Sequence, residues 1–121
     1  VRSVEKIISS DLEVIPTGYI LIDGGRETSV QKVSKTIPIN QKDLKLVVNT
    51  ALAGKYLGKQ LIYLEAGSGA EYPVSSEIIE AVSSTLEIPL IVGGGIRTQQ
   101  QMHNAYKSGA TMVVMGTAFE K

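Results

Sequence analysis

The sequence lacks cysteine altogether, and this absence excludes two kinds of site at once. With none among 121 residues, the chain has neither a disulfide framework nor a thiolate ligand for a metal ion. It has a single histidine, and nowhere do acidic and histidine residues follow a spacing typical of a metal centre. The residues present therefore predict no metal site of their own, and the cysteine-free composition is compatible with a reducing cytoplasm.

The chain also lacks an excess of charge of either sign and any long apolar run. Basic and acidic residues both number 12, so we expect no nucleic-acid partner and no attraction to an anionic membrane surface. No apolar run approaches the roughly 18 residues of a membrane-spanning helix, and the N-terminus lacks the pattern of a signal peptide. With 43% apolar residues, enough for a core, we expect one soluble, cytoplasmic domain.

What the chain does have is two apolar, β-branched runs that end in glycine. Residues 90–97 read LIVGGGIR and residues 112–117 read MVVMGT. A run without polar alternation is typical of a strand buried on both faces. Glycines let the backbone approach a ligand and point N–H groups at it, and Thr98 begins a helix whose N-terminus carries partial positive charge. Together these features predict a phosphate-binding site.

Strand and helix patterns alternate along the rest of the chain. The predicted elements are strands near 19–22, 60–65, 90–93 and 111–116, and helices over 1–10, 41–57, from Ser75 or Ser76, and from Thr98 to Gly109, with an irregular loop over 28–39. The helix over 41–57 has an apolar face of Leu44, Val48, Ala51 and Leu52, a possible N-cap at Asn40 and a stop at Gly58. In the last helix, Thr98 and Gln101 match a capping box, with Met102, Ala105 and Tyr106 expected to be buried.

This order predicts a parallel α/β sheet. Four βα units with glycine loops after the strands favour the C-terminal half of a TIM (β/α)8 barrel, because phosphate sites in such barrels come from the loops after strands seven and eight. A complete barrel takes about 250 residues. We therefore expect residues 1–121 to be a single domain that forms the second half of a barrel, with the first half outside this sequence.

Three motifs together resemble the geranylgeranylglyceryl phosphate synthase family: residues 13–19 (EVIPTGY), 63–70 (YLEAGSGA) and 88–97 (IPLIVGGGIR). The resemblance covers essentially the whole chain, and its most specific part is the second motif. It implies a prenyltransferase that joins sn-glycerol 1-phosphate to a prenyl diphosphate, with geranylgeranyl as the expected prenyl group, and releases diphosphate to form an ether lipid precursor. It also implies Mg²⁺, held by an acid in the first half of the barrel, a homo-oligomer, and a product that is handed to the membrane.

The resemblance assigns roles to individual positions. The implied phosphate-binding residues are Gly93, Gly94, Gly95 and Ile96, with Gly116 and Thr117 after the next strand. The implied glycerol-binding residues are Tyr63, Leu64, Glu65, Ser68 and Gly69, and the implied catalytic residue is Glu65.

Strand geometry gives this pairing a physical basis. Residues 63 and 65 point to the same side of a strand, so Tyr63 and Glu65 can meet one small substrate. Our hypothesis is that Glu65 accepts hydrogen bonds from the glycerol hydroxyls and acts as a base or an orienting group, with Tyr63 as the hydroxyl partner. The alternative is a glutamate that is simply paired with a neighbouring lysine or arginine.

Other candidates have two interpretations each. Asp23 is either a turn residue or the catalytic acid of a sugar-phosphate isomerase or lyase barrel, which is the competing enzyme hypothesis. Arg97 either helps to hold an anion or is solvated, and Tyr19 lies in a prenyl groove or at the core or rim. His103 is expected at the surface. A third hypothesis, outside the enzymes, is an inactive half-barrel that binds phosphate.

Overall fold

The computed structural model describes residues 15–25, 37–67 and 69–115. Strands and helices alternate through them, in the order β1 (Thr17–Leu21), α3 (Leu44–Tyr56), β2 (Leu61–Glu65), α4 (Ser76–Thr85), β3 (Leu90–Gly93), α5 (Gln99–Ser108) and β4 (Met112–Val114). The helix expected over 1–10 and most of the loop expected over 28–39 lie outside the described residues.

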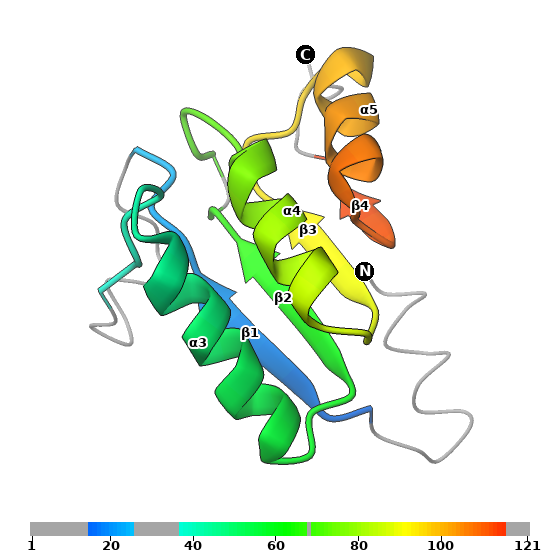
Figure 1. Ribbon diagram of the computed structural model, residues 1–121. Helices are drawn as coiled ribbons and strands as arrows, with labels where there is room; N and C mark the ends of the chain where they lie inside the picture. Colours follow the sequence, from blue (N-terminus) through cyan, green and yellow to red (C-terminus); the bar gives the residue numbers. More distant parts are fainter. Residues whose placement is uncertain (1–14, 26–36, 68, 116–121) are drawn as a thin grey trace.

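The strands form one parallel sheet in the order β1-β2-β3-β4, as Figure 1 shows. Each strand pairs with the next one in the chain, and in this register Tyr63 lies opposite Tyr19 on one side and Ile91 on the other. The parallel α/β architecture is therefore confirmed. Because all strands run the same way, the loops that follow β1, β2 and β3 meet at one edge of the sheet.

The helices α3, α4 and α5 lie on one face of this sheet (Figure 1). The strand side chains that point toward them are almost completely buried, and with residues of the helices they form the core: Ile20, Ile62, Leu64, Leu90 and Val92 from strands, Val47 from α3, and Ile78, Ile79 and Val82 from α4. Burial of this apolar surface is the main force that holds the helices on the sheet.

The opposite face of the sheet has no helix on it among the described residues. Tyr19 is 72% exposed there and Met112 is 48% exposed, although both belong to strands that read as apolar. The expectation of burial on both faces is thus met only on the helix side. In a complete (β/α)8 barrel this second face is the packed interior, which strands from the whole ring fill together.

The N-terminus of α3 corrects one predicted cap. The N-cap is Asp43, whose carboxylate accepts a hydrogen bond from the Leu46 N–H at 3.2 Å. The Asn40 side chain instead accepts one from the Lys42 N–H at 2.8 Å, which stabilises the turn before the helix. At the other end, α3 stops before Gly58, as predicted, with this glycine at a φ of 97°.

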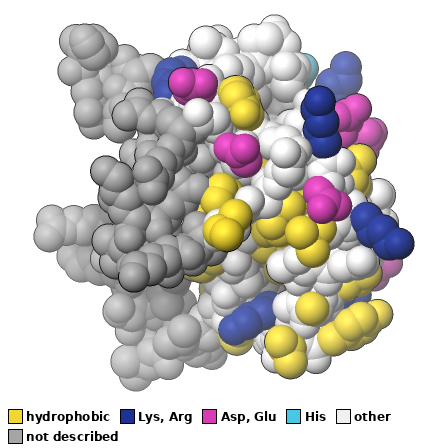
Figure 2. Space-filling model, turned by 90° about the vertical axis from the view of Figure 1, so that its left-hand side faces the viewer, with side chains coloured by type: hydrophobic (Ala, Val, Ile, Leu, Met, Phe, Trp, Pro, Cys, Tyr) yellow, Lys and Arg dark blue, Asp and Glu magenta, His cyan; other side chains and the backbone are white. Residues whose placement is uncertain are grey.

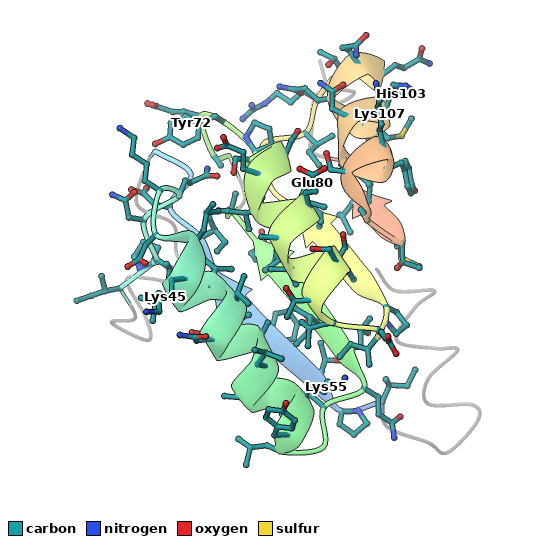
Figure 3. The ribbon with its side chains drawn as sticks, in the orientation of Figure 1. Lys45, Lys55, Tyr72, Glu80, His103 and Lys107 are labelled. Atoms are coloured by element: carbon teal, nitrogen blue, oxygen red, sulfur yellow. The ribbon has the colours of Figure 1, made fainter. Side chains whose placement is uncertain are left out.

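The two ends of α5 lie where they were predicted, but only some of its side chains that were predicted to be buried are buried. Thr98 and Gln101 form a capping box, and Gly109 caps the C-terminus. Ala105 is buried, yet Tyr106 is 45% exposed. The prediction for Tyr106 was wrong because α5 is the last described helix: it packs mainly on α4 and β4, and no further described helix follows it to cover its remaining surface. His103 is exposed on α5, as expected (Figure 3).

Candidate functional site

The loops after β1 and β2 are joined by backbone hydrogen bonds at the carboxyl edge of the sheet. The carbonyl oxygen of Gly24 accepts from the N–H groups of Glu71, at 2.8 Å, and Tyr72, at 3.2 Å. The loop after β2 is in turn joined to β3, because the Ala66 N–H donates to the Gly93 carbonyl at 2.9 Å. The three loop regions therefore form one continuous backbone platform.

Gly94 and Gly95 make the turn that follows β3, which we call the glycine turn. Their φ angles of 89° and 75° lie in the left-handed region that favours glycine. The turn also packs tightly on the loop between β2 and α4. A Cβ atom on Gly94 would come within 2.6 Å of the Gly67 nitrogen, and one on Gly95 within 2.7 Å of the Tyr72 carbonyl carbon. Both positions therefore require glycine for conformation and for space.

The backbone N–H groups at and after the glycine turn differ in their hydrogen bonding. Within the described ranges, no oxygen accepts a hydrogen bond from the N–H of Gly95 or of Ile96. The capping box, by contrast, occupies the N–H groups of Arg97, Thr98 and Gln101. Among the described residues, the N–H groups of Gly95 and Ile96 thus have no acceptor, whereas these three amides at the start of α5 are occupied.

Tyr63 and Glu65 lie beside this turn, on the face of the sheet that has no helix. Glu65 is opposite Gly93 in the register of β2 and β3. The Tyr63 hydroxyl lies over Gly93, where an added Cβ atom would come within 2.8 Å of it. The Tyr63 ring stacks on that of Tyr19, with ring centroids 5.0 Å apart. The predicted placement of residues 63 and 65 on one side of the strand is confirmed.

The protonation state of Tyr63 follows from its surroundings. Burial of the Tyr63 ring, and then the charge of Glu65 and a hydrogen bond to its carboxylate, raise the pKa of Tyr63 well above its usual 10.0. The hydroxyl therefore keeps its proton and serves as a hydrogen-bond donor. Glu65 also accepts a hydrogen bond from the Gly67 N–H at 3.0 Å. Within the described part of the chain, the Glu65 carboxylate accepts from the Gly67 N–H and is not paired with a lysine or arginine, as its ion-pair alternative would require.

Two predicted site residues turn their side chains away from this pair. Leu64 is 0% exposed and lies in the core under the helices, because it alternates with Tyr63 and Glu65 along β2. Its side chain therefore cannot contact a ligand on the other face, and only its backbone is available for the predicted role. The Ile96 side chain is also buried in the core, so only its backbone is available. Gly69 is exposed in the loop after β2, whereas Ser68, Gly116 and Thr117 lie outside the described residues.

Asp23 and Arg97 have definite roles in the loops. The Asp23 carboxylate accepts a hydrogen bond from the Gly25 N–H at 2.9 Å, so the interpretation as a turn residue is confirmed. Arg97 is bonded within the protein and is not simply solvated, whereas its role in holding an anion stays a prediction. Its guanidinium donates to the carbonyl oxygens of Ala70 and Gly95, and it thereby joins the loop after β2 to the glycine turn.

Sequence reasoning missed Gln41 entirely. Its side-chain amide bonds to the backbone of Asp23, Pro73 and Ser75, which lie 18 to 34 residues away along the chain. No local pattern marks such a residue, because a lone glutamine before a helix has no periodicity and no capping role. The only sequence signal is its place next to Asn40, in a turn that precedes α3.

A cavity of about 400 Å³ lies elsewhere, between the N-terminal part of α4 and α5. Its walls include Pro73, Ile79 and Ala105 but neither Tyr63 nor Glu65. It therefore belongs to the helix side of the sheet and is not the place where these two side chains meet a ligand. Tyr72, at its rim, lies in the loop beside the β1 end, as Figure 3 shows.

The described residues form no metal centre, and the face shown in Figure 2 carries no patch of one charge. Over residues 15–25, 37–67 and 69–115, no three acidic or histidine side chains come together to hold a metal ion. These residues alone do not fit a Mg²⁺ site. Figure 2 shows basic and acidic side chains interspersed on the face it presents. None of the described helices has the length and apolar character needed to cross a membrane.

Comparison with known proteins agrees with the geometry of the site. The PcrB family model matches residues 1–121. The chain is 58% identical over 120 residues to geranylgeranylglyceryl phosphate synthase of Zunongwangia profunda, covering 99% of this chain and 51% of that relative. It is 48% identical over 110 residues to the enzyme of the same name from Thermococcus kodakarensis, covering 91% of this chain and 43% of that one.

Solved structures show the same relationship. The Thermoplasma acidophilum (S)-3-O-geranylgeranylglyceryl phosphate synthase, crystallised in complex with sn-glycerol 1-phosphate, matches with a TM-score of 0.83 and 39% identity over 98% of this chain and 48% of its own. The Thermoplasma volcanium enzyme matches with the same TM-score and 38% identity, over 97% of this chain and 48% of its own. The chain thus spans about half the length of the relatives it matches, and its fold corresponds to half of their TIM barrel.

Proposed function

The chain belongs to the PcrB family, and from this membership we propose that it forms the C-terminal half of a prenyltransferase that makes an ether lipid precursor. In the proposed reaction, a hydroxyl oxygen of sn-glycerol 1-phosphate attacks the carbon that bears the diphosphate of a prenyl donor, such as geranylgeranyl diphosphate. A C–O ether bond forms, the bond from that carbon to the diphosphate breaks, and the hydroxyl proton is lost.

The observation that carries this proposal is the position of Tyr63 and Glu65 beside Gly93, the last residue of β3 before the glycine turn. A glycerol phosphate has a phosphate at one end and hydroxyls at the other. The N–H groups of Gly95 and Ile96 are suited to the phosphate, and the Glu65 carboxylate, opposite Gly93 in the sheet, is suited to the hydroxyls. The neutral chain would then hold an anion through backbone dipoles instead of a basic cluster.

Glu65 and Tyr63 have different roles in the proposed reaction. Glu65 accepts the hydrogen bond of the attacking hydroxyl and takes its proton as the ether bond forms. Tyr63 stays protonated, donates to Glu65 and keeps the carboxylate turned toward the turn. Departure of the diphosphate does not require a covalent bond between enzyme and substrate. Positioning of the nucleophile therefore supplies most of the rate acceleration. Ser68, Gly69, Gly116 and Thr117 are proposed to complete the pocket.

A Glu65→Gln variant of the full-length enzyme tests the chemical role. We expect kcat for prenyl transfer to fall by about 100-fold, because an amide cannot take the proton, with a smaller rise in the KM for sn-glycerol 1-phosphate. Glu80→Gln, on the exposed surface of α4, is the matched control and should leave both constants unchanged. Undiminished turnover of Glu65→Gln at saturating substrate would reject the role.

We further propose that a first half of the barrel precedes this chain in the natural protein. Two observations support this: the exposed apolar residues on the helix-free face of the sheet, and relatives of about twice the length. The native protein should then have about twice the 13.0 kDa mass of this chain. A native mass near 13.0 kDa would instead favour the inactive phosphate-binding half-barrel.

We also propose that the whole protein uses Mg²⁺, forms a homo-oligomer and is located in the cytoplasm. Since the described residues do not supply a metal site, the Mg²⁺ ligands are expected in the first half, and no step above depends on the ion. Removal of the ion by chelation should abolish prenyl transfer, and added Mg²⁺ should restore it.

The homo-oligomer is tested by sedimentation, and the cytoplasmic location, with a product that passes to the membrane, by cell fractionation. The isomerase or lyase alternative loses its main support, because the Asp23 carboxylate is engaged in a turn.

A further inference from the structure

Gln41 uses its whole side-chain amide to join three segments of backbone. Its Nε2 donates to the Asp23 carbonyl at 2.9 Å and to the Pro73 carbonyl at 3.0 Å. Its Oε1 accepts from the Ser75 N–H at 2.7 Å. The side chain is partly buried, and Ser75 is the N-cap of α4. One residue thus holds the end of β1, the end of the next loop and the start of a helix in a single arrangement.

The part of the loop that Gln41 holds is the part on which the glycine turn rests. A Cβ atom on Gly95 would come within 2.8 Å of both the Pro73 nitrogen and the Tyr72 carbonyl oxygen. Because the two backbones are in close contact, a displacement of Pro73 also displaces Gly95. The direction of the Gly95 N–H, which faces the ligand in the proposed function, therefore depends on a glutamine that does not itself border the ligand.

Arg97 joins the same two backbones from the other side. Its Nη2 donates to the Ala70 carbonyl, and its Nη1 is 3.5 Å from the Gly95 carbonyl oxygen. The planar guanidinium can reach both oxygens at once because its N–H groups point in fixed, diverging directions. A lysine carries the same charge but cannot reproduce this fork.

We propose that Gln41 and Arg97 are positioning residues that hold the loop between β2 and α4 against the glycine turn and so set the geometry of glycerol-phosphate binding. The inference rests on the proposed function. Neither residue touches the substrate. Each acts through backbone carbonyls, Gln41 through Pro73 and Arg97 through Ala70 and Gly95.

The test is steady-state kinetics of the full-length enzyme with Gln41→Glu, Gln41→Met and Arg97→Lys. Glutamate has nearly the shape of glutamine but sets a carboxylate against two carbonyl oxygens, whereas methionine removes all three bonds without adding charge. We expect each variant to raise the KM for sn-glycerol 1-phosphate about 10-fold to 100-fold, because small displacements of a binding group have effects of this size. The KM for the prenyl diphosphate should stay within about twofold of the wild-type value.

The controls separate positioning from general destabilisation and from a direct charge effect. Gln100→Glu makes the same chemical change on the exposed face of α5 and should alter neither KM. A merely structural role would lower the thermal midpoint and leave the KM for sn-glycerol 1-phosphate unchanged, which would overturn the proposal. If Arg97→Lys binds sn-glycerol 1-phosphate as tightly as wild type, Arg97 acts by charge and its part of the proposal is wrong.

The outcome for the proposed function can be told apart from the outcome for this inference. Wild-type enzyme that fails to transfer a prenyl group contradicts the proposed function. In that case calorimetric titration with sn-glycerol 1-phosphate still compares wild-type and variant affinity, and a loss in Gln41→Met supports the positioning role. Active wild-type enzyme with variants of unchanged KM contradicts the positioning role alone.

Discussion

Tyr63 contributes a hydroxyl that keeps its proton, and this has a consequence at high pH. Its pKa is raised above the usual 10.0, so the folded state favours the neutral form. The resulting stability is fully present below pH 10 and is lost as the pH rises toward the raised pKa, since unfolded tyrosine ionises first. Activity should therefore not fall through ionisation of Tyr63 anywhere below pH 10.

Alkaline titration of tyrosinate absorbance measures this directly. The wild-type protein should contain a tyrosine that ionises only well above pH 10, and Tyr63→Phe should lack this late component. Tyr106→Phe, which removes an exposed tyrosine on α5, should retain it. A late component that survives in Tyr63→Phe would mean that another tyrosine is responsible.

Gly95 permits a second prediction at the scale of the residue. In Gly95→Ala the alanine must keep a backbone φ that is strained for any residue with a side chain. Its Cβ atom also clashes with backbone atoms of Tyr72 and Pro73. The two effects together should lower the free energy of unfolding by about 2–6 kcal/mol. Gly58→Ala is a matched control, since Gly58 has a φ of 97° but nothing within 4 Å of the added Cβ atom.

Denaturant unfolding of the two variants separates strain from packing. Gly58→Ala should lose only the strain part, about 1–3 kcal/mol. Equal losses in the two variants would show that the close contact of the glycine turn with the neighbouring loop contributes nothing to stability.

At the scale of the element, the capping box of α5 does more than begin a helix. The Gln101 side chain accepts from the N–H groups of both Thr98, at 3.1 Å, and Arg97, at 2.7 Å. It therefore also fixes the residue that bridges the two loops. The start of α5 thus positions Arg97 beside the glycine turn, whose N–H groups bind the phosphate in the proposed function.

Thr98→Ala removes the cap that accepts the Gln101 N–H. We expect a loss of about 1 kcal/mol in the free energy of unfolding. Thr85→Ala, at the exposed end of α4, should change stability little, because its hydroxyl only bonds back to the Ala81 carbonyl within the helix. Chemical denaturation of both variants provides the measurement, and a Thr98→Ala protein as stable as wild type would contradict the capping role.

At the scale of the whole molecule, helices cover one face of the sheet, and the described residues place no helix on the other. Tyr19, Tyr63, Ile91 and Met112 form a row across the helix-free face in the register of the four strands. A protein that exposes such a row should bind apolar molecules or a further piece of protein there. In the proposed barrel, the first half buries this row.

An apolar fluorescent dye tests this arrangement. The 121-residue chain should bind the dye and enhance its fluorescence, whereas the full-length protein should not. Tyr19→Asp combined with Met112→Asp should weaken dye binding by the short chain. Equal fluorescence with the short chain and the full-length protein would argue that the row is not the surface buried by the first half.

Much of the fold and part of the site follow from local patterns in the sequence. The order of strands and helices, the capping box, the stop at Gly58 and the placement of Tyr63 and Glu65 on one side of β2 all depend on the period of the backbone or on neighbouring residues. The misses were of two kinds. The N-cap of α3 is Asp43 and not Asn40, two possible capping residues only three positions apart. The burial of Tyr106 depended on how many elements surround α5.

The sequence by itself determined which segments form strands and helices and which glycines must turn, because these properties arise within a few residues. Only the tertiary structure decided which partners Gln41 and Arg97 hold. Their hydrogen bonds cross 18 to 34 residues for Gln41 and 27 for the bond from Arg97 to Ala70. Such bonds form only when the parallel sheet has brought the loop ends to one edge. No periodicity in the sequence predicts them.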